Sequence, residues 1–469
     1  MRIRRAAALA AVLLMPTAAL AQGGGVDFSR YVALGDSLTA AFQSGGLAQS
    51  SQAGSYPRIL HELATGNDSF EQPLVSDPGI PAQLRLASLA PLVIAPKPGG
   101  GQPINIALPR PYDNLGVPGA FVHDTLVTSA GGLHDVVLRG VYIPQLAGTT
   151  ALQQALALNP TFVTLWIGNN DILAAATSGV VIEGVTLTPL AQFESDYRTI
   201  VGALAQGGRK LALLTLPRVT AIPFVTTVPP VVVNPATRQP VLINGQTVPL
   251  IGPNGPLAAN DRVLLTAQAE LAQGKGIPPP LGGTGQPLSN SVVLSAAEVQ
   301  AIQTRADGFN SVIRAVAGER GAALFDVERF FDAVVSDGYD LGGVGFTAAF
   351  LTGGLFSYDG VHPTAMGYGI IADELVQAIN AKYGSSIPRV KLGKLMRSGA
   401  ATTAPVTALE ARTAQLSERW DENWRWTLGL PSKAKLEEMA AEAGEPAGNG
   451  DGAGHGHGGA HQGEETPEP

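Results

Sequence analysis

The hydrophobic positions of this chain fall into short continuous runs separated by longer stretches with helical periodicity. A short apolar run bounded by turn-forming residues is typical of a strand that is buried on both faces. Strands that alternate with helices predict a parallel sheet covered by helices on both sides. We therefore expect an α/β fold of three αβα layers around a parallel sheet of about five strands. The expected strands are Tyr31 to Leu34, a short strand ending near Asn114, Phe162 to Ile167, Lys210 to Leu216 and Ala322 to Phe325.

Three helices are marked by their starts or by an apolar face. The first follows Thr188 and Pro189, which we expect to be its N-cap and its first-turn proline. The second begins with the capping box of Ser295 and Glu298, and the last runs from about Ala365 to Lys382. The inner positions of the first are Phe193, Tyr197, Ile200, Val201 and Leu204, and those of the second are Val299, Ile302, Phe309, Ile313 and Val316.

Two stretches interrupt this alternation. Residues 39–112 are rich in Pro, Gly and Gln, and we expect mostly loop with one or two short helices. Residues 217–290 are predicted to form an insertion over one end of the sheet, with a hairpin at Asn244-Gly245. The apolar loop Ile222 to Val233 within it is either a wall of a substrate pocket or the insertion's own small core, which is the more common arrangement under long loops.

The N-terminal residues have the order of a leader sequence. Basic residues among the first five are followed by an apolar run from Ala6 to Leu14 and by small residues ending at Ala21. This order predicts a secretory signal peptide over residues 1–21, so we expect a secreted or periplasmic protein. The apolar run is too short to span a bilayer.

Composition excludes several kinds of site. The chain of 469 residues is 45% hydrophobic, enough for one large core or two smaller ones. It contains no cysteine, which rules out disulfides, a thiolate nucleophile and cysteine metal sites. The net charge of −8 belongs to the C-terminal tail, where residues 436–469 hold eight carboxylates and no Lys or Arg. The remainder is neutral, which argues against a nucleic-acid partner, and no metal-ligand spacing is present.

These features predict four regions along the chain. Residues 386–435 are expected to be a linker and one amphipathic helix, Ala408 to Trp426, whose Trp420 and Trp424 dock on the body or on a partner. The acidic, low-complexity end is expected to be disordered. The regions are residues 1–21 as signal peptide, 26–385 as main domain with the insertion at about 217–290, 386–435 as linker and helix, and 436–469 as tail.

Four separated blocks combine residue types suited to acyl transfer. Each is predicted to lie beside the carboxyl edge of the sheet, where open α/β sheets place their sites. A serine needs a base to become nucleophilic, and a tetrahedral oxyanion needs preplaced hydrogen-bond donors. Taken singly, each block also fits turn or capping chemistry, which does not require all four together. The blocks are Gly35-Asp36-Ser37-Leu38, Asn114-Leu-Gly116-Val-Pro-Gly119, Gly168-Asn169-Asn170-Asp171 and Asp359-Gly-Val-His362-Pro363.

In content and order the blocks resemble those of the GDSL, or SGNH, hydrolases, and the likeness covers about residues 28–382 without the insertion. The resemblance implies a flavodoxin-like, doubly wound sheet and a serine hydrolase without a cofactor or a metal. It assigns Ser37 as nucleophile, His362 as base and Asp359 as the residue that orients the imidazole. It also assigns an oxyanion hole to the backbone N–H groups of Ser37 and Gly119 and the side-chain amide of Asn170.

The resemblance implies a carboxylic ester hydrolase, an esterase or lipase acting on small-molecule or lipid esters. The apolar, uncharged loops beside the blocks favour lipid or short acyl esters. Contact with a membrane surface or the cell envelope is compatible with this function. Within the same class, the alternative is an O-acetyl esterase acting on polysaccharide. From another class, the alternative is a surface-associated binding protein with a vestigial site. Oligomeric state is not predicted by any feature of the sequence.

Overall fold

The centre of the molecule is a five-stranded parallel sheet. The computed structural model describes residues 25–234, 236–397 and 406–443, so the expected leader and the tail from residue 444 lie outside it. The strand order is β4-β1-β5-β6-β13, and every neighbouring pair is parallel. Along the chain this is the order 2-1-3-4-5 of a flavodoxin-like fold, so the predicted fold class is confirmed. The strands are β1 (Tyr31–Gly35), β4 (Asn114–Gly116), β5 (Phe162–Trp166), β6 (Lys210–Leu214) and β13 (Ala323–Phe325).

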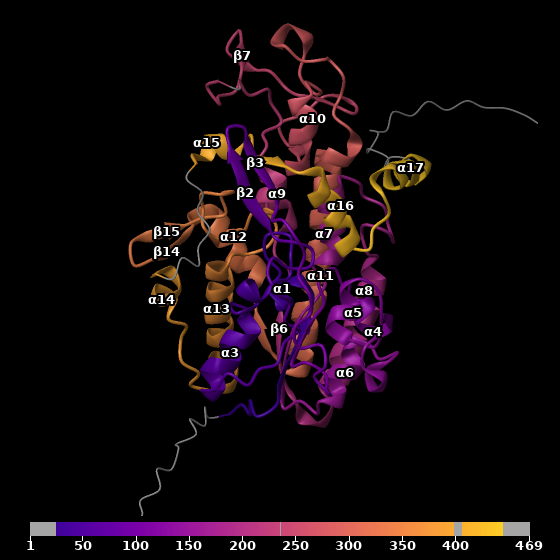
Figure 1. The fold of residues 1–469 in the computed structure, drawn as a ribbon, viewed down its shortest axis with the longest axis vertical. Coiled ribbons are helices and arrows are strands. Elements are labelled where there is room, and N and C mark those ends of the chain that lie inside the picture. The colour runs from indigo at the N-terminus through magenta and orange to yellow at the C-terminus, as the bar shows by residue number, and fades with distance from the viewer. Residues whose placement is uncertain (1–24, 235, 398–405, 444–469) are drawn as a thin grey trace, which may run out of the picture.

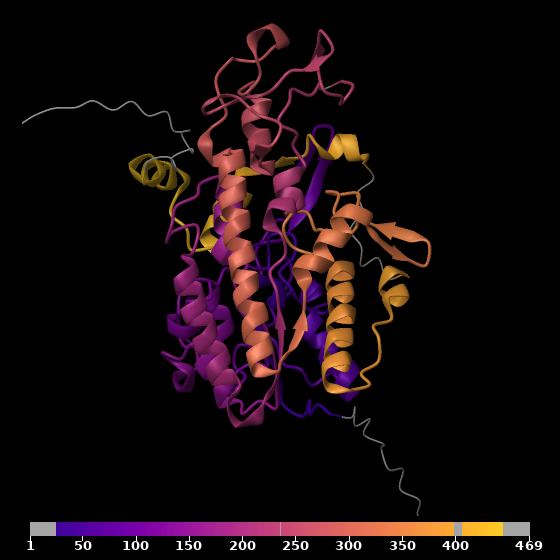
Figure 2. The same ribbon diagram turned by 180° about the vertical axis from the view of Figure 1, so that it is seen from behind.

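Helices cover both faces of this sheet and complete the three layers (Figure 1). On one side lie α3 (Tyr56–Thr65) and α13 (Ala365–Tyr383), and α6 (Ala151–Ala157) and α8 (Leu190–Leu204) lie on the other. The long helix α11 (Ala296–Arg320) packs along α8, as Figure 2 shows from behind. The short helices are α1 (Ser37–Ala40), α2 (Gln49–Gln52), α4 (Asp124–Val127), α5 (Leu133–Leu138), α7 (Asn170–Ser178), α9 (Pro223–Thr226), α10 (Gln268–Ala272), α12 (Val327–Asp337) and α14 (Leu392–Arg397).

The register of the sheet brings three strand ends to one level. Gly35, the last residue of β1, pairs with Gly116 at the end of β4 and with Trp166 at the end of β5. A Cβ atom on Gly35 would lie 2.2 Å from the Thr39 side chain, and one on Gly116 would lie 2.5 Å from the backbone nitrogen of Ala40. Because neither residue has a side chain, α1 packs directly against the strand ends. Ser37 therefore lies at the carboxyl edge, next to the loops that follow β4 and β5.

The predicted helices are present, with one correction at a helix start. The capping box of Ser295 and Glu298 opens α11, as expected, and α13 covers the predicted C-terminal helix. The structure places Pro189 at the N-cap of α8, without a side-chain cap. Thr188, which we expected to cap this helix, donates its backbone N–H to the carbonyl of Asp171 at 3.0 Å.

Residues 39–112 contain a hairpin that the sequence did not predict. Strands β2 (Leu84–Leu89) and β3 (Leu92–Pro96) pair antiparallel, with a register shift between Leu86 and Ser88. Prolines at both ends and this irregularity hide the alternation that identifies strands. The second sheet strand also differs from expectation, because β4 starts at Asn114 instead of ending near it. The Asn114 side chain donates to the Thr39 carbonyl and accepts from Gly116, which fixes this residue within the strand.

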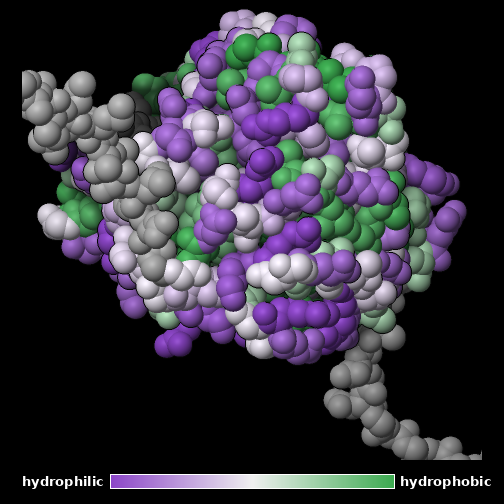
Figure 3. Space-filling view, turned by 90° about the horizontal axis from the view of Figure 1, so that it is seen from below, coloured by the Kyte–Doolittle hydropathy of each residue, from purple (hydrophilic) through white to green (hydrophobic). Residues whose placement is uncertain are grey.

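The insertion extends beyond the carboxyl end of the sheet (Figure 1). Its Asn244-Gly245 hairpin is confirmed, since both residues have positive φ angles between β7 (Leu242–Ile243) and β8 (Gln246–Thr247). The remaining short strands are β9 (Ile251–Gly252), β10 (Gly255–Pro256), β11 (Arg262–Val263), β12 (Val293–Leu294), β14 (Tyr339–Leu341) and β15 (Val344–Phe346). At the opposite end of the molecule, Figure 3 shows hydrophobic residues interspersed among hydrophilic ones.

The C-terminal segment differs from the single helix expected over residues 408–426. It forms α15 (Ala408–Ala411), the strand β16 (Gln415–Leu416) and α16 (Glu418–Thr427). β16 adds to the β2–β3 hairpin by pairing with β3, which interrupts the helix. Residues 436–443, assigned to a disordered tail, belong instead to α17 (Lys433–Ala443), where Leu436 packs against Val180 and Ile182. Among the described residues, no helix has the length and apolar character needed to cross a membrane.

The capping box of α11 gives a test of how local sequence stabilises the fold. The Ser295 side chain accepts a hydrogen bond from the backbone N–H of Glu298. Ser295→Ala is expected to lower the free energy of unfolding by about 1 kcal/mol, because a helix N–H loses its partner. Ser311→Ala, at an exposed position of the same helix, should change it by less than half as much. Denaturant unfolding of both variants measures the difference, and equal effects would contradict the role of the cap.

Candidate active site

Three side chains from distant parts of the sequence form a continuous hydrogen-bonded chain. Ser37 is the first residue of α1, and His362 lies on the loop before α13. The His362 Nε2 and Ser37 Oγ atoms are 3.0 Å apart, and the His362 Nδ1 and Asp359 Oδ2 atoms are 2.9 Å apart. All three residues are 1–2% exposed. The structure therefore brings the expected nucleophile, base and orienting carboxylate into contact.

Asp359 is held by donors from two loops. Its Oδ1 accepts from the backbone N–H groups of Val361 and His362 and from the Ser357 hydroxyl. Its Oδ2 accepts from His362 Nδ1 and from the backbone N–H of Gly45, at 2.7 Å. Burial raises the pKa of Asp359, but the charge of His362 and these hydrogen bonds outweigh burial and hold the pKa below its ordinary value. The carboxylate therefore stays ionised, and its position fixes the imidazole.

The expected oxyanion-hole residues lie on neighbouring loops at the same edge. Gly119 has a φ of +86° in the loop after β4, a conformation that suits glycine. Asn170 is the first residue of α7, and its side-chain Nδ2 donates to the carbonyl of Ala120 at 2.8 Å. That bond ties the amide group to the loop that carries Gly119 and uses one of the two N–H bonds on Nδ2. The backbone N–H of Ser37 lies at the start of α1, where the first N–H groups of a helix lack helical partners.

Two polar residues of the motifs received no role from the sequence. Asp36 caps α1 by accepting from the backbone N–H of Leu38, and it also accepts from the Asn169 side chain at 2.8 Å. Burial raises the pKa of Asp36 to about 6. Asn169 lines a small cavity together with Ser37 and His362. The position of Asp36 before a short helix was the available signal for a cap, but its pairing with Asn169 depends on the fold.

Asp171 joins the third block to the second. Its Oδ2 accepts from the backbone N–H of Val122, three residues after Gly119, at 3.0 Å. Burial raises the pKa of Asp171 to about 7, against the opposing effect of hydrogen bonds from Thr188 and Val122. Asp171 thus positions the loop of Gly119 relative to α7. It does so at a cost in stability once the carboxyl group is ionised.

Two histidines of the described residues have hydrogen-bond partners outside the triad. His123 is half exposed and pairs through Nδ1 with Asp196 at 2.9 Å. His61 pairs with Asn67. Within the described part of the chain, no group of three or more metal-ligating side chains is placed to hold a metal ion.

The buried carboxyl of Asp171 gives a pH-dependent prediction. Between pH 3.8 and about 7 the folded protein retains a proton that the unfolded chain has released, so this group lowers stability as pH rises. Asp171→Asn removes that loss while keeping an oxygen for the Val122 N–H. The free energy of unfolding of the variant minus that of the parent should therefore be about 4 kcal/mol larger at pH 8 than at pH 4.

Chemical denaturation at pH 4, 6 and 8 measures this difference. Asp337→Asn, at an exposed position at the end of α12, is the control and should show no comparable change. A stability difference for Asp171→Asn that stays constant over this pH range would contradict the prediction.

Comparison with known proteins identifies the family. Residues 31–375 match the family model described as GDSL-like Lipase/Acylhydrolase. No curated protein matches the chain. Similar solved structures include an acetylxylan esterase from Geobacillus stearothermophilus, at 15% identity over 79% of this chain and 100% of that one, with a TM-score of 0.34. A lipase/acylhydrolase from Enterococcus faecalis is 15% identical over 58% of this chain and 76% of that one, with a TM-score of 0.25.

The family match covers the sheet and all four blocks, and the insertion lies inside it. Everything after residue 375, including β16, α16 and α17, lies beyond the matched residues. The match extends over more than half of the chain and agrees with the resemblance seen in its motifs. The chain belongs to the GDSL-like lipase/acylhydrolase family.

Proposed function

We propose that this protein is a secreted serine esterase or lipase that hydrolyses carboxylic esters through an acyl-enzyme on Ser37. The observation that carries this proposal is the buried hydrogen-bonded chain from Ser37 through His362 to Asp359. A binding protein has no need of a serine paired with an oriented imidazole, so this geometry disfavours a vestigial site. Family membership supports ester hydrolysis, and the leader-like residues 1–21 support export.

In the acylation step Ser37 Oγ attacks the ester carbonyl carbon while His362 Nε2 takes the hydroxyl proton. The carbonyl oxygen becomes an oxyanion that accepts from the N–H groups of Ser37 and Gly119 and from Asn170 Nδ2. Collapse of this intermediate breaks the bond to the alcohol oxygen, which receives the proton from His362. Asp359 keeps Nδ1 protonated, so that Nε2 is the free acceptor at the start.

In the deacylation step water attacks the acyl carbon and gives its proton to His362 Nε2. The second intermediate breaks the bond to Ser37 Oγ, which regains the proton and releases the carboxylic acid. Asp359 stabilises the imidazolium in both halves of the cycle. The low pKa of Asp359 suits this role because a protonated carboxyl group would not favour the imidazolium.

Replacement of the nucleophile tests the proposal. Ser37→Ala is expected to lower kcat for p-nitrophenyl butyrate by at least about 1,000-fold, because the acyl-enzyme cannot form. The variant should also lose covalent labelling by a fluorophosphonate, measured as the mass increase of the intact protein. Ser336→Ala, an exposed serine on α12, should keep both activities. Equal hydrolysis rates for Ser37→Ala and the parent protein would overturn the proposal.

A further inference from the structure

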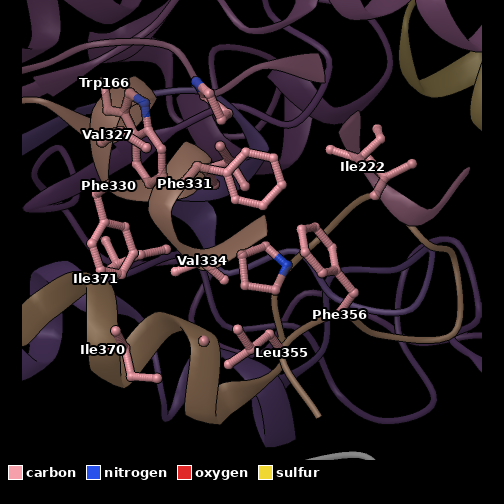
Figure 4. A pocket seen from close by; sticks show the side chains of 15 residues that line it. Trp166, Ile222, Val327, Phe330, Phe331, Val334, Leu355, Phe356, Ile370 and Ile371 are labelled. Carbon is pink, nitrogen blue, oxygen red and sulfur yellow. The ribbon is translucent and has the colours of Figure 1, made fainter. Parts of the chain in front are cut away.

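We propose that an apolar cavity beside Ser37 binds the acyl chain of the substrate and selects short acyl groups of about four carbons. The inference rests on the proposed function and adds a substrate class to it. The cavity has a volume of about 90 Å³ and lies between α12, α13 and the loop before α13. Its walls are formed by apolar residues alone, and Figure 4 shows Ile222 on one side and Phe330 and Ile371 on the other.

The cavity lies next to a smaller one that the catalytic residues line. A smaller cavity of about 30 Å³ is lined by Ser37, His362 and Asn169, and it shares four walls with the larger one. The shared residues are Leu38, Pro217, Ile222 and Val361. Leu38 and Val361 are chain neighbours of Ser37 and His362. An acyl group attached to Ser37 Oγ therefore enters the smaller cavity, and its chain extends toward the larger one past these shared side chains.

The chemistry of the walls selects the ligand. Among the side chains of the walls, only that of Trp166 carries a polar atom, and this Nε1 donates to the backbone carbonyl of Thr215 at 3.1 Å. A sugar or a charged acyl chain would lose its hydrogen bonds to water without finding new ones here. An acetyl group would leave most of the space empty. The cavity thus favours an apolar acyl chain over an acetylated polysaccharide.

The size of the cavity limits the length of the chain. A cavity of roughly 150 Å³ accommodates the six carbons of benzene, so a volume of about 90 Å³ suits about four carbons. Each buried methylene group contributes roughly a fourfold gain in affinity. We expect kcat/KM to rise by at least tenfold from the acetyl to the butyryl ester and to fall again for octanoyl and longer esters.

Neighbouring valines on α12 provide a matched pair of variants. Val334 is 4% exposed and lines the cavity, whereas Val335 is 47% exposed on the outer face. Val334→Phe should lower kcat/KM for p-nitrophenyl butyrate by at least tenfold and leave the acetate ester within about twofold. Val335→Phe should change neither. Ile371→Ala, which enlarges the same cavity, should move the optimum toward hexanoyl.

The outcomes separate this inference from the proposed function. Hydrolysis that persists in Ser37→Ala would overturn the proposed function. Hydrolysis that requires Ser37 but shows the same chain-length profile in the parent, Val334→Phe and Ile371→Ala would overturn the acyl site alone. Because Ile371→Ala reduces packing instead of adding bulk, it remains informative if Val334→Phe does not fold.

A second and independent observation concerns the C-terminal cover, which we define as residues 415–430. We propose that this segment, which contains β16 and α16, closes the catalytic site and must move before an ester reaches Ser37. The Trp424 ring lies edge-on to the His362 ring, with centroids 5.4 Å apart. The backbone carbonyl of Thr427 would lie 1.7 Å from a Cβ atom on Gly119. The cover therefore sits on both the proposed base and an oxyanion-hole residue.

Several contacts hold the cover in this place, including the pairing of β16 with β3 and the packing of Trp420 against Gly45. Trp420 packs on Phe224 of the insertion at a centroid distance of 5.2 Å, and Trp424 Nε1 donates to Thr177 Oγ1 at 3.0 Å. The Nε1 of Trp420 is buried without a hydrogen-bond partner among the described residues. A buried N–H group without a partner lowers the stability of the closed arrangement relative to an open one.

Tryptophans on the same helix test the cover. Trp420→Ala removes an anchor that does not touch the triad, and it should raise the rate constant for inactivation of Ser37 by phenylmethylsulfonyl fluoride at least fivefold. Trp426→Ala, at a 49% exposed position of α16, should leave that rate within twofold. Thr177→Val keeps the side-chain shape, removes the hydrogen bond to Trp424 and should also accelerate inactivation. Unchanged or slower inactivation of both Trp420→Ala and Thr177→Val, with circular dichroism matching the parent, would overturn the cover.

Discussion

The arrangement of the site depends on the carboxylate of Asp359. This group accepts from Gly45, on the loop after α1, and from Val361 and His362 on its own loop. The two loops are more than 300 residues apart in the sequence. Together with the hydrogen bond from the Ser44 N–H to the Ser357 hydroxyl, that contact fixes the His362 ring relative to Ser37. Gly45 also lies against Trp420, since a Cβ atom on this glycine would approach the tryptophan ring to 3.1 Å. The same few atoms therefore connect the triad, the loop after the nucleophile and the C-terminal cover.

Buried acidic groups make this edge of the sheet less stable than its apolar centre. Desolvation raises the pKa of Asp36 to about 6 and that of Asp171 to about 7, whereas Asp359 is shifted the other way. Asp359 differs because it has an imidazole partner and several donors. Asp36 and Asp171 instead accept from the backbone N–H groups of Leu38 in α1 and of Val122 in the loop after β4. These two carboxyl groups lower the stability of the fold, and in return they hold the backbone around the site in one arrangement before substrate binds.

Most strands of the central sheet and the residues of the triad could be predicted from the sequence. Buried strands of a parallel sheet are continuous apolar runs, so β1, β5, β6 and β13 were located, whereas β4, Asn114–Gly116, was predicted too early in the chain. The capping box of α11 was a local signal. The triad residues lie in short motifs beside strand or helix ends, where parallel topology brings them together.

The hairpin of β2 and β3 was missed because its alternation of apolar and polar residues is interrupted. The helix expected over residues 408–426 was wrong because β16 pairs with β3, a contact between segments more than 300 residues apart. Gly45 acts through its backbone N–H, which donates to Asp359. Every residue except proline has such a group, so the residue type gave no signal.

The apolar loop Ile222 to Val233 of the insertion was interpreted from the sequence as either a pocket wall or a small core. In the structure different residues of this loop do each. Ile222 forms a wall shared by the two cavities, whereas Val228 and Val232 are buried in the core. The described residues that line either cavity include none from α16. The acyl cavity and the cover therefore act on different parts of an ester. The walls next to Leu38 and Val361 receive the acyl chain, and the cover occupies the side of His362 and Gly119 that Trp424 and Thr427 contact. Movement of the cover would then control access for the alcohol portion, while the length of the acyl chain is set by residues of α12 and α13 that need not move.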